Sequence, residues 1–310
     1  MEISLLIAKQ ILAMLIMACF GFTAVRLGLL KADHSRILSI IIIYIVTPCV
    51  SLSAFQVELT ETRIHGMLIA LVGSIIIHVI YIAAAYFLGK WRGISDITKA
   101  SLIFTNAGNL IIPLVRATLG AEMTIYTCVF MLVQTIITWT YGVILISGEK
   151  KTPWKKIFSN INIIAILAGL ALFIFQIRIP ALFENAVESV AGIIGPLSML
   201  MIGTLVGGMN LAEIFRDRSN YLYCLTKLIL FPVIVILVLK VMGLMSADPE
   251  QILLIPILAA AAPSAINVTN IAQLYERSVD KAASLNISST ILCVATIPLM
   301  VWFYELMAVL

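Results

Sequence analysis

The chain has 310 residues, of which 62% are hydrophobic and only 12% are charged, and its formal net charge is +4. About a quarter of the residues in a soluble globular domain are charged. This composition therefore excludes a soluble domain. Apolar stretches of about 20 residues, each enough to cross the hydrocarbon core of a bilayer, recur along the whole sequence.

The sequence predicts ten membrane-spanning helices joined by short connections. They cover residues 5–24, 37–56, 66–89, 98–118, 122–147, 159–177, 187–209, 221–244, 251–275 and 282–307. The first span lacks the basic segment and the small-residue cleavage site of a signal peptide, so we expect it to be retained.

Lysine and arginine are concentrated in every second loop, and this bias predicts the orientation of the spans. The basic loops follow the odd-numbered spans and contain Arg26, Lys31, Arg36, Lys90, Arg92, Lys99, Lys150, Lys151, Lys155, Lys156, Arg216, Arg218, Arg277 and Lys281. Such loops face the cytoplasm. We therefore expect a multi-pass protein of the cell membrane with both termini outside the cell.

A basic loop near the middle divides the spans into two groups of five. The predicted units are a first repeat at 1–148, a cytoplasmic linker at 149–158 and a second repeat at 159–310. Because each group has an odd number of spans, the second would be inverted relative to the first, as in many secondary transporters. Prolines at corresponding places, Pro48 with Pro196, support the repeat.

The fourth and ninth spans contain residues that interrupt a helix. The fourth includes TNAGNLIIPLVR at 105–116, and the ninth includes AAAPSAINVTN at 260–270. A proline removes a backbone donor, and such a break in a membrane requires partners from protein or from a watery cavity. We expect Pro113 and Pro263 to open new half-helices, whose free N–H groups and positive dipole ends favour an anion.

Two broken helices that meet near the midplane predict a binding site for a small polar or anionic solute. Asparagine amides can donate to a carboxylate without bringing a full charge into the membrane. The candidate substrate-binding residues are Asn106, Gly108, Asn109, Pro113, Arg116, Pro263, Ser264, Asn267 and Asn270. Arg116 is alternatively an outer gate or a side chain that snorkels to the headgroups. The competing interpretation of both motifs is proline kinks whose asparagines hold helices together.

The other ionisable residues within the spans give weaker signals. We expect Lys9 and Lys227 to snorkel to the headgroups, and His78 to be an interior histidine rather than a proton relay. No Asp or Glu lies well inside a predicted span, although coupled carriers often need one. The histidines are scattered rather than clustered, which argues against an intramembrane enzyme. No metal site and no cofactor are predicted. Broken helices without rings of charged residues favour a carrier over a channel.

These motifs resemble those of the auxin efflux carrier family, which includes plant PIN exporters and bacterial malate and malonate carriers. The resemblance rests on residues 47–55, 106–114, 262–276 and 284–299, and it extends over essentially the whole chain. The sequence lacks the long central cytoplasmic loop of plant PIN proteins, so it is similar to the short bacterial members.

The resemblance implies an all-α polytopic membrane protein in which ten transmembrane helices form two inverted five-helix repeats, with helices 4 and 9 broken and crossing at Pro113 and Pro263, as in bile-acid transporters. Helices 1, 2, 6 and 7 would form a scaffold, often dimeric, and helices 3–5 and 8–10 a moving transport domain. Asn109 or Asn106 would hold the substrate carboxylate. Asn267 and Val268 stand where the plant pattern has a second proline, which argues against an auxin-like substrate.

The sequence thus predicts a secondary transporter that moves small organic anions, namely mono- or dicarboxylates, by elevator-type alternating access. Its expected partners are the anion, the lipid bilayer and a second copy of the chain, and no nucleic acid. Two alternatives stay open. One is a sodium- or proton-coupled symporter of the bile-acid-transporter type, and the other is an exporter of auxin-like aromatic carboxylates.

Overall fold

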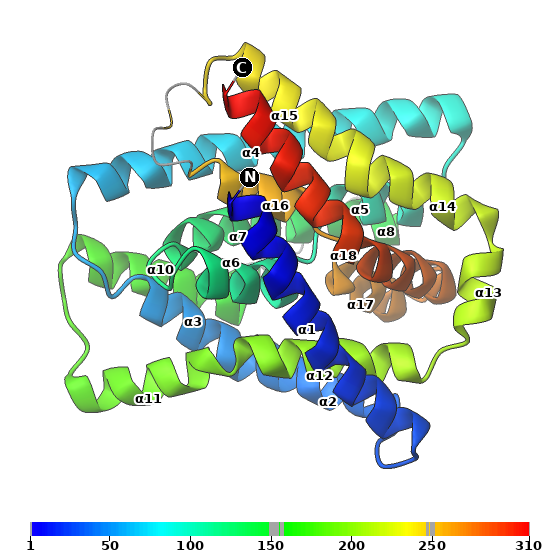
Figure 1. The fold of residues 1–310 in the computed structure, drawn as a ribbon, viewed down its shortest axis with the longest axis horizontal. Coiled ribbons are helices and arrows are strands. Elements are labelled where there is room, and N and C mark those ends of the chain that lie inside the picture. Colours follow the sequence, from blue (N-terminus) through cyan, green and yellow to red (C-terminus); the bar gives the residue numbers. More distant parts are fainter. Residues whose placement is uncertain (1, 149–154, 156–157, 246–247, 249–251, 310) are drawn as a thin grey trace.

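The structure is a computed structural model, and it describes all residues except 1, 149–154, 156–157, 246–247, 249–251 and 310 (Figure 1). The described residues form helices, with one isolated β-bridge and no strand. Most of the predicted linker at 149–158 lies outside the described residues.

The first half of the chain contains helices joined by short connections. Its elements are α1 (Glu2–Arg26), α2 (His34–Ile41), η1 (Ile42–Val46), α3 (Thr47–Ala54), α4 (Glu61–Arg92), α5 (Asp96–Ile103), η2 (Ala107–Ile111), α6 (Ile112–Thr118), α7 (Thr124–Ile137), η3 (Thr138–Gly142) and α8 (Val143–Ser147). The η elements are single π-helical turns that continue directly into α-helix.

The second half is also helical. Its elements are α10 (Ile161–Ile174), α11 (Ala181–Gly192), α12 (Ile194–Gly207), α13 (Leu211–Arg216), α14 (Arg218–Leu225), η4 (Thr226–Leu230), α15 (Phe231–Val241), α16 (Leu254–Ala260), α17 (Ile266–Leu274) and α18 (Val279–Val309).

Seven helical stretches among the described residues are long and apolar enough to cross a membrane. They are Ile3–Arg26, His34–Ala54, Glu61–Arg92, Thr124–Ser147, Ala181–Gly207, Arg218–Val241 and Val279–Ala308. This confirms a polytopic helical membrane protein. The other three predicted spans contain shorter helices. Spans 98–118 and 251–275 are each interrupted, and span 159–177 contains the shorter apolar helix Ile161–Ile174.

Local sequence explains where several helices begin and end. The side chain of Thr60 accepts a hydrogen bond from Arg63 N at 3.2 Å before α4, and Ser95 accepts one from Thr98 N at 3.3 Å before α5. These are N-caps that satisfy otherwise unpaired donors. Gly93 ends α4 with a φ of 64°, a left-handed conformation that favours glycine. The connection between α4 and α5 is therefore short and well defined.

The helices pack in two groups. In the first group, α1 and α2 contact α12, and α10 and α11 contact α3; α11 and α12 run along the lower edge of Figure 1 with α2 and α3 beside them. In the second group, α4 contacts α5, α7 and α16, while α18 contacts α5, α14, α15 and α17. The two groups also contact each other, chiefly where α1 packs on α18, and η2 and α6, which follow the first interruption, contact both α7 and α12.

Small residues allow α1 and α12 to approach closely. A Cβ atom added at Gly21 would lie 2.9 Å from the Thr204 nitrogen, and one added at Gly203 would lie 2.9 Å from the Phe22 nitrogen. Neither space can hold a side chain, so glycine is required at both positions. Close backbone approach through small residues is a common way to join helices in lipid.

Candidate functional site

Two interrupted segments meet in the interior and pair with each other. One follows α5 at residues 104–106, and the other follows α16 at residues 261–265. Asn106 N donates to Pro263 O at 2.8 Å, and Ala265 N donates to Phe104 O at 3.1 Å. These bonds flank an isolated antiparallel bridge between Thr105 and Ser264. We call this arrangement the crossing.

The first break does not lie where the sequence placed it. Pro113 was expected to open the half-helix, but helical structure already begins at Ala107 and continues through η2 and α6. The helix continues past the proline through a π-turn, in which Ile112 N bonds to Ala107 O. Pro113 follows at the start of α6, where its missing N–H is tolerated. The second break, by contrast, includes Pro263 as expected.

Polar side chains hold the backbone of both bridge residues. Oε1 of Gln134 accepts from the nitrogen and the hydroxyl of Thr105 at 3.0 and 2.8 Å, and its Nε2 donates to Thr105 O at 2.8 Å. Ser264 N donates to Oγ of Ser289 at 3.1 Å, and Asn286 Nδ2 donates to Ser264 O at 2.5 Å. Irregular backbone in a membrane requires such partners.

Side chains also cap the carbonyl ends of the two half-helices that lead into the crossing. At the end of α5, Lys227 Nζ donates to Leu102 O at 2.6 Å and lies 3.4 Å from Phe104 O. At the end of α16, Tyr81 donates its hydroxyl to Ala260 O at 2.9 Å. The final carbonyls of a helix have no partner within it, so these two side chains stabilise the breaks.

The expectation that Lys227 snorkels to the headgroups is wrong. Its side chain is fully buried and points at the end of α5. Carbonyl oxygens freed by the helix break attract the ammonium more strongly than distant headgroups do. His78 is an interior residue as expected: it is buried, it bonds through Nδ1 to Ser74 O at 2.7 Å, and its ring lies tilted against that of Phe130. The expectation that it is not a proton relay stays a prediction.

The structure brings only some of the predicted site residues into the interior. The buried ones are Asn106, Asn109, Pro113, Pro263 and Ser264. Gly108 and Arg116 are partly buried, whereas Asn267 and Asn270 are exposed on α17. That these nine residues contact the substrate stays a prediction.

Two buried polar atoms at the crossing have no hydrogen-bond partner within the described part of the chain. They are Nδ2 of Asn106 and Oγ of Ser264. A buried donor without a partner is costly, and a bound ligand is one way to satisfy it. Both residues belong to the segments that pair at the crossing.

The crossing also presents the N-terminal ends of two helices. Asn106 precedes η2 and Ala265 precedes α17, and neither helix receives a side-chain cap at this end. Unpaired N–H groups and the helix dipole make such ends favourable for negative charge. Chemically, the crossing can therefore accept a small group rich in hydrogen-bond acceptors.

Arg116 forms an ion pair that links the two groups of helices. At the end of α6, it contacts the carboxylate of Glu188 on α11, and Ser53 on α3 donates to the same carboxylate. The Arg116 side chain is 12% exposed and that of Glu188 is 50% exposed. Arg116 therefore pairs with a carboxylate of the protein, and its role as an outer gate stays a prediction.

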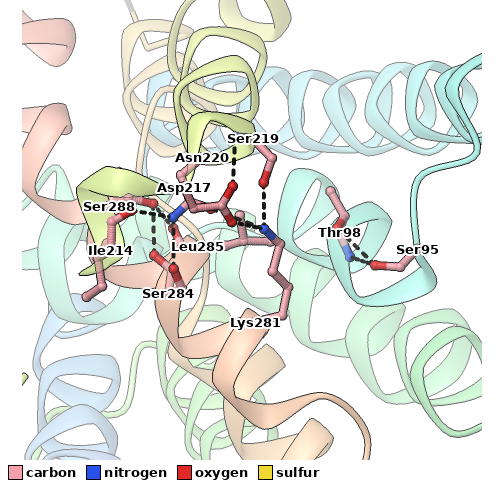
Figure 2. Close-up of polar contacts among 10 residues, drawn as sticks. All are labelled: Ser95, Thr98, Ile214, Asp217, Ser219, Asn220, Lys281, Ser284, Leu285 and Ser288. Carbon is pink, nitrogen blue, oxygen red and sulfur yellow. Dashed lines mark hydrogen bonds and ion pairs between the residues drawn. The ribbon is translucent and has the colours of Figure 1, made fainter. Parts of the chain in front are cut away.

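A second polar cluster joins α13 and α14 to the first turn of α18 (Figure 2). Lys281 Nζ lies 2.9 Å from Asp217 Oδ2 and 2.8 Å from Ser219 Oγ. Asn220 Nδ2 donates to Ser284 Oγ at 2.9 Å. Hydrogen bonds from Lys281 and then from Ser219 lower the pKa of Asp217 to about 2. The carboxylate is therefore ionised at neutral pH, and the cluster fixes this loop.

Sequence reasoning missed the residues that support the crossing. Gln134, Asn286 and Ser289 are polar residues within apolar spans, and this was the available signal. Residues 284–299 served only as evidence of resemblance, although Asn286 and Ser289 contact the broken segment directly. Tyr81 carried no signal beyond its aromatic character.

These features define a helical multi-pass membrane protein built around two interrupted segments. A protein-family model described as "Membrane transport protein" matches residues 6–153 and 149–301. The chain belongs to this family of membrane transporters, which confirms the resemblance to auxin efflux carriers. A search of the curated proteins found no match.

Proposed function

We propose that the chain is a secondary transporter of small organic anions, namely mono- or dicarboxylates, and that the crossing binds the carboxylate. The observation that carries this proposal is the buried amide of Asn106. Its Nδ2 has no partner among the described residues and lies where an uncapped helix begins. Membership of a transporter family makes a transported solute the natural partner for this donor.

In this binding mode, Asn106 and Asn109 donate their amides to the carboxylate. The N–H groups at the start of η2 and of α17 add further donors. Gly108 leaves room for the ligand, since a Cβ atom added there would touch only the end of Met131, at 3.5 Å. Ser264 supplies a hydroxyl from the opposite segment. Asn267 and Asn270, which are exposed here, would contact the anion in another state of the cycle.

The paired supports at the crossing favour ten helices in two inverted repeats. Gln134 lies in the predicted fifth span and Asn286 in the tenth, and each holds the bridge residue of its own half. Tyr81 lies in the third span and Lys227 in the eighth, and each caps the half-helix of the other half. Equivalent spans thus have equivalent roles, as expected for a duplicated unit.

The two packing groups support an elevator mechanism in which the crossing moves relative to a scaffold. Helices α1, α2, α3, α10, α11 and α12 correspond to the proposed scaffold, and the others to the transport domain. The Arg116–Glu188 ion pair and the packing of α1 on α18 connect the two groups. Our proposal keeps both termini outside the cell and allows a scaffold-mediated homodimer.

Binding is tested by thermal unfolding of the purified protein in detergent with a panel of organic acids that includes malate, malonate, succinate and lactate. A ligand that binds only the native state raises the unfolding temperature, Tm. We expect at least one carboxylate to raise the Tm of the wild type and of the control Asn185→Ala, which changes an exposed residue of α11. We expect no such rise in Asn106→Ala or Asn109→Ala. No response to any organic anion would contradict the proposal.

A further inference from the structure

Lys227 is a cationic side chain enclosed in the interior of the transport region. It lies on η4 and is fully buried. Its Nζ is 2.6 Å from Leu102 O and 3.4 Å from Phe104 O, and it lies 5.1 Å from the centroid of the Tyr81 ring. None of the ion pairs found among the described residues includes Lys227.

The partners of Lys227 are suited to a positive charge. Leu102 O lies in the last turn of α5, where the helix dipole is negative, and Phe104, whose carbonyl also accepts from Ala265 N, is the residue that follows the helix. The face of an aromatic ring also attracts a cation, and more strongly when water is excluded. The ammonium therefore has electrostatic partners although no carboxylate pairs with it.

The end of a broken half-helix is also where coupled transporters hold their cation. In carriers with discontinuous helices, unwound carbonyl groups and C-terminal helix ends coordinate sodium ions or protons. Here the Nζ of Lys227 lies among carbonyl oxygens of this kind. A mobile cation and the ammonium would compete for the same oxygen atoms.

We propose that the Lys227 ammonium is a built-in cation of the crossing, which occupies the place of a coupling sodium ion at the C-terminal end of α5. Its charge offsets that of the bound anion, so transport does not require sodium. This consequence for transport rests on the proposed function, whereas the occupation of the cation position does not.

The charges around the crossing fit this assignment. Residues 97–118 and 252–274, which include both interrupted segments, contain no Asp or Glu. Several oxygen ligands are needed to hold a sodium ion, and here the ammonium already bonds to Leu102 O at the end of α5, while Phe104 O also accepts from Ala265 N. The corresponding end of α16 is capped by the neutral hydroxyl of Tyr81. Of the two half-helix C-terminal ends at the crossing, only that of α5 therefore has a charged side chain as its partner.

The test measures Tm in sodium chloride and in choline chloride at equal ionic strength, with no organic anion present. The variants are Lys227→Ala and Lys227→Gln, which both remove the charge; alanine also leaves Leu102 O without this donor, whereas the glutamine amide can still donate to it. The matched control is Lys240→Ala, because Lys240 of α15 also donates to a carbonyl, Met307 O at 2.8 Å, but far from the crossing along the same helical stretch.

We expect the wild type and Lys240→Ala to have the same Tm in both salts. We expect both Lys227 variants to be less stable in choline and to gain about 2 °C or more in sodium, because a sodium ion replaces the ammonium. A variant that folds only in sodium would give the same support more strongly.

Three results would overturn the inference. A wild type that sodium stabilises would have a cation site that Lys227 does not fill. Variants that unfold at the same temperature in both salts, or that fold in neither salt, would mean that no mobile cation can replace the ammonium. These outcomes involve no organic anion, so they are distinguishable from failure of the proposed anion binding.

Discussion

The side chain of Asn106 has an unusual position, since it is buried at the crossing while its Nδ2 has no partner in the described chain. Asn106→Ala removes this donor, whose Nδ2 makes no hydrogen bond to the described residues. We expect carboxylate affinity to fall about 10- to 100-fold, the loss of one hydrogen bond to a charged group, about 1.5–3 kcal/mol. We expect Tm without ligand to stay unchanged or to rise.

Titration calorimetry and thermal unfolding of the same sample measure the two effects separately. A variant with unchanged carboxylate affinity would remove Asn106 from the site. A fall in both Tm and affinity would make it a structural residue.

Gln134 has the opposite role, because its amide satisfies Thr105 through three hydrogen bonds. Gln134→Ala leaves a buried backbone N–H and C=O without partners, and we expect a loss of at least about 2 kcal/mol of stability. Denaturation in detergent measures this loss. Gln273→Ala, at an exposed position of α17, is the control and should be nearly neutral. Equal effects of the two substitutions would contradict this role of Gln134.

At the residue scale, the sequence allowed part of the site to be predicted. The asparagines and prolines were visible because they are unusual in apolar spans. Lys227 was misjudged because hydropathy gives the depth of a residue but not the face of the helix on which it lies. Only the folded chain brings the carbonyl groups of α5 within reach of its ammonium.

At the scale of elements, the interrupted helices show that a proline does not by itself determine where a membrane helix breaks. The fourth span breaks at residues 104–106, a new helical stretch begins at Ala107, and Pro113 lies within that stretch. The extended conformation is stabilised by pairing with residues 263–265 of the other half. Such tertiary pairing cannot be read from local residue preferences, so the sequence predicted the existence of the break but not its place.

Because the fourth span breaks before Pro113 rather than at it, we can predict the effect of Pro113→Ala. Since the preceding π-turn already accommodates the proline, alanine should preserve both the crossing and carboxylate binding. We expect stability to change by no more than about 1 kcal/mol. Thermal unfolding with and without the stabilising carboxylate measures both quantities. A loss of the ligand response would show that Pro113 shapes the binding site.

At the scale of the whole molecule, hydropathy predicted most of the long helices, because the bilayer sets their length. The positions of the helices relative to each other could not be predicted from hydropathy. Packing in lipid depends on small residues such as Gly21 and Gly203, which are not distinguished by hydrophobicity. The pairing of Arg116 with Glu188 joins spans that are far apart in the sequence, and no local pattern indicated it.

The ion pair between Arg116 and Glu188 should restrain movement of the transport region against the scaffold. The side chain of Glu188 is half exposed and glutamine keeps an oxygen that can accept from Arg116, so Glu188→Gln should cost about 1 kcal/mol or less and change Tm little. The same energy shifts a conformational equilibrium about fivefold, and we expect carboxylate uptake to become faster by up to that factor. Glu184→Gln on the same helix is the control. An unchanged uptake rate would mean that this contact does not limit the cycle.

Uptake of radiolabelled carboxylates into sodium-free proteoliposomes tests the central claim most directly. We predict that the wild type accumulates at least one mono- or dicarboxylate faster than protein-free vesicles do, and that Asn106→Ala reduces this uptake while Asn185→Ala does not. Uptake that Asn106→Ala leaves intact would contradict the assignment of the crossing as the binding site. If the wild type moves no organic anion across a broad panel, the proposed transport function is wrong.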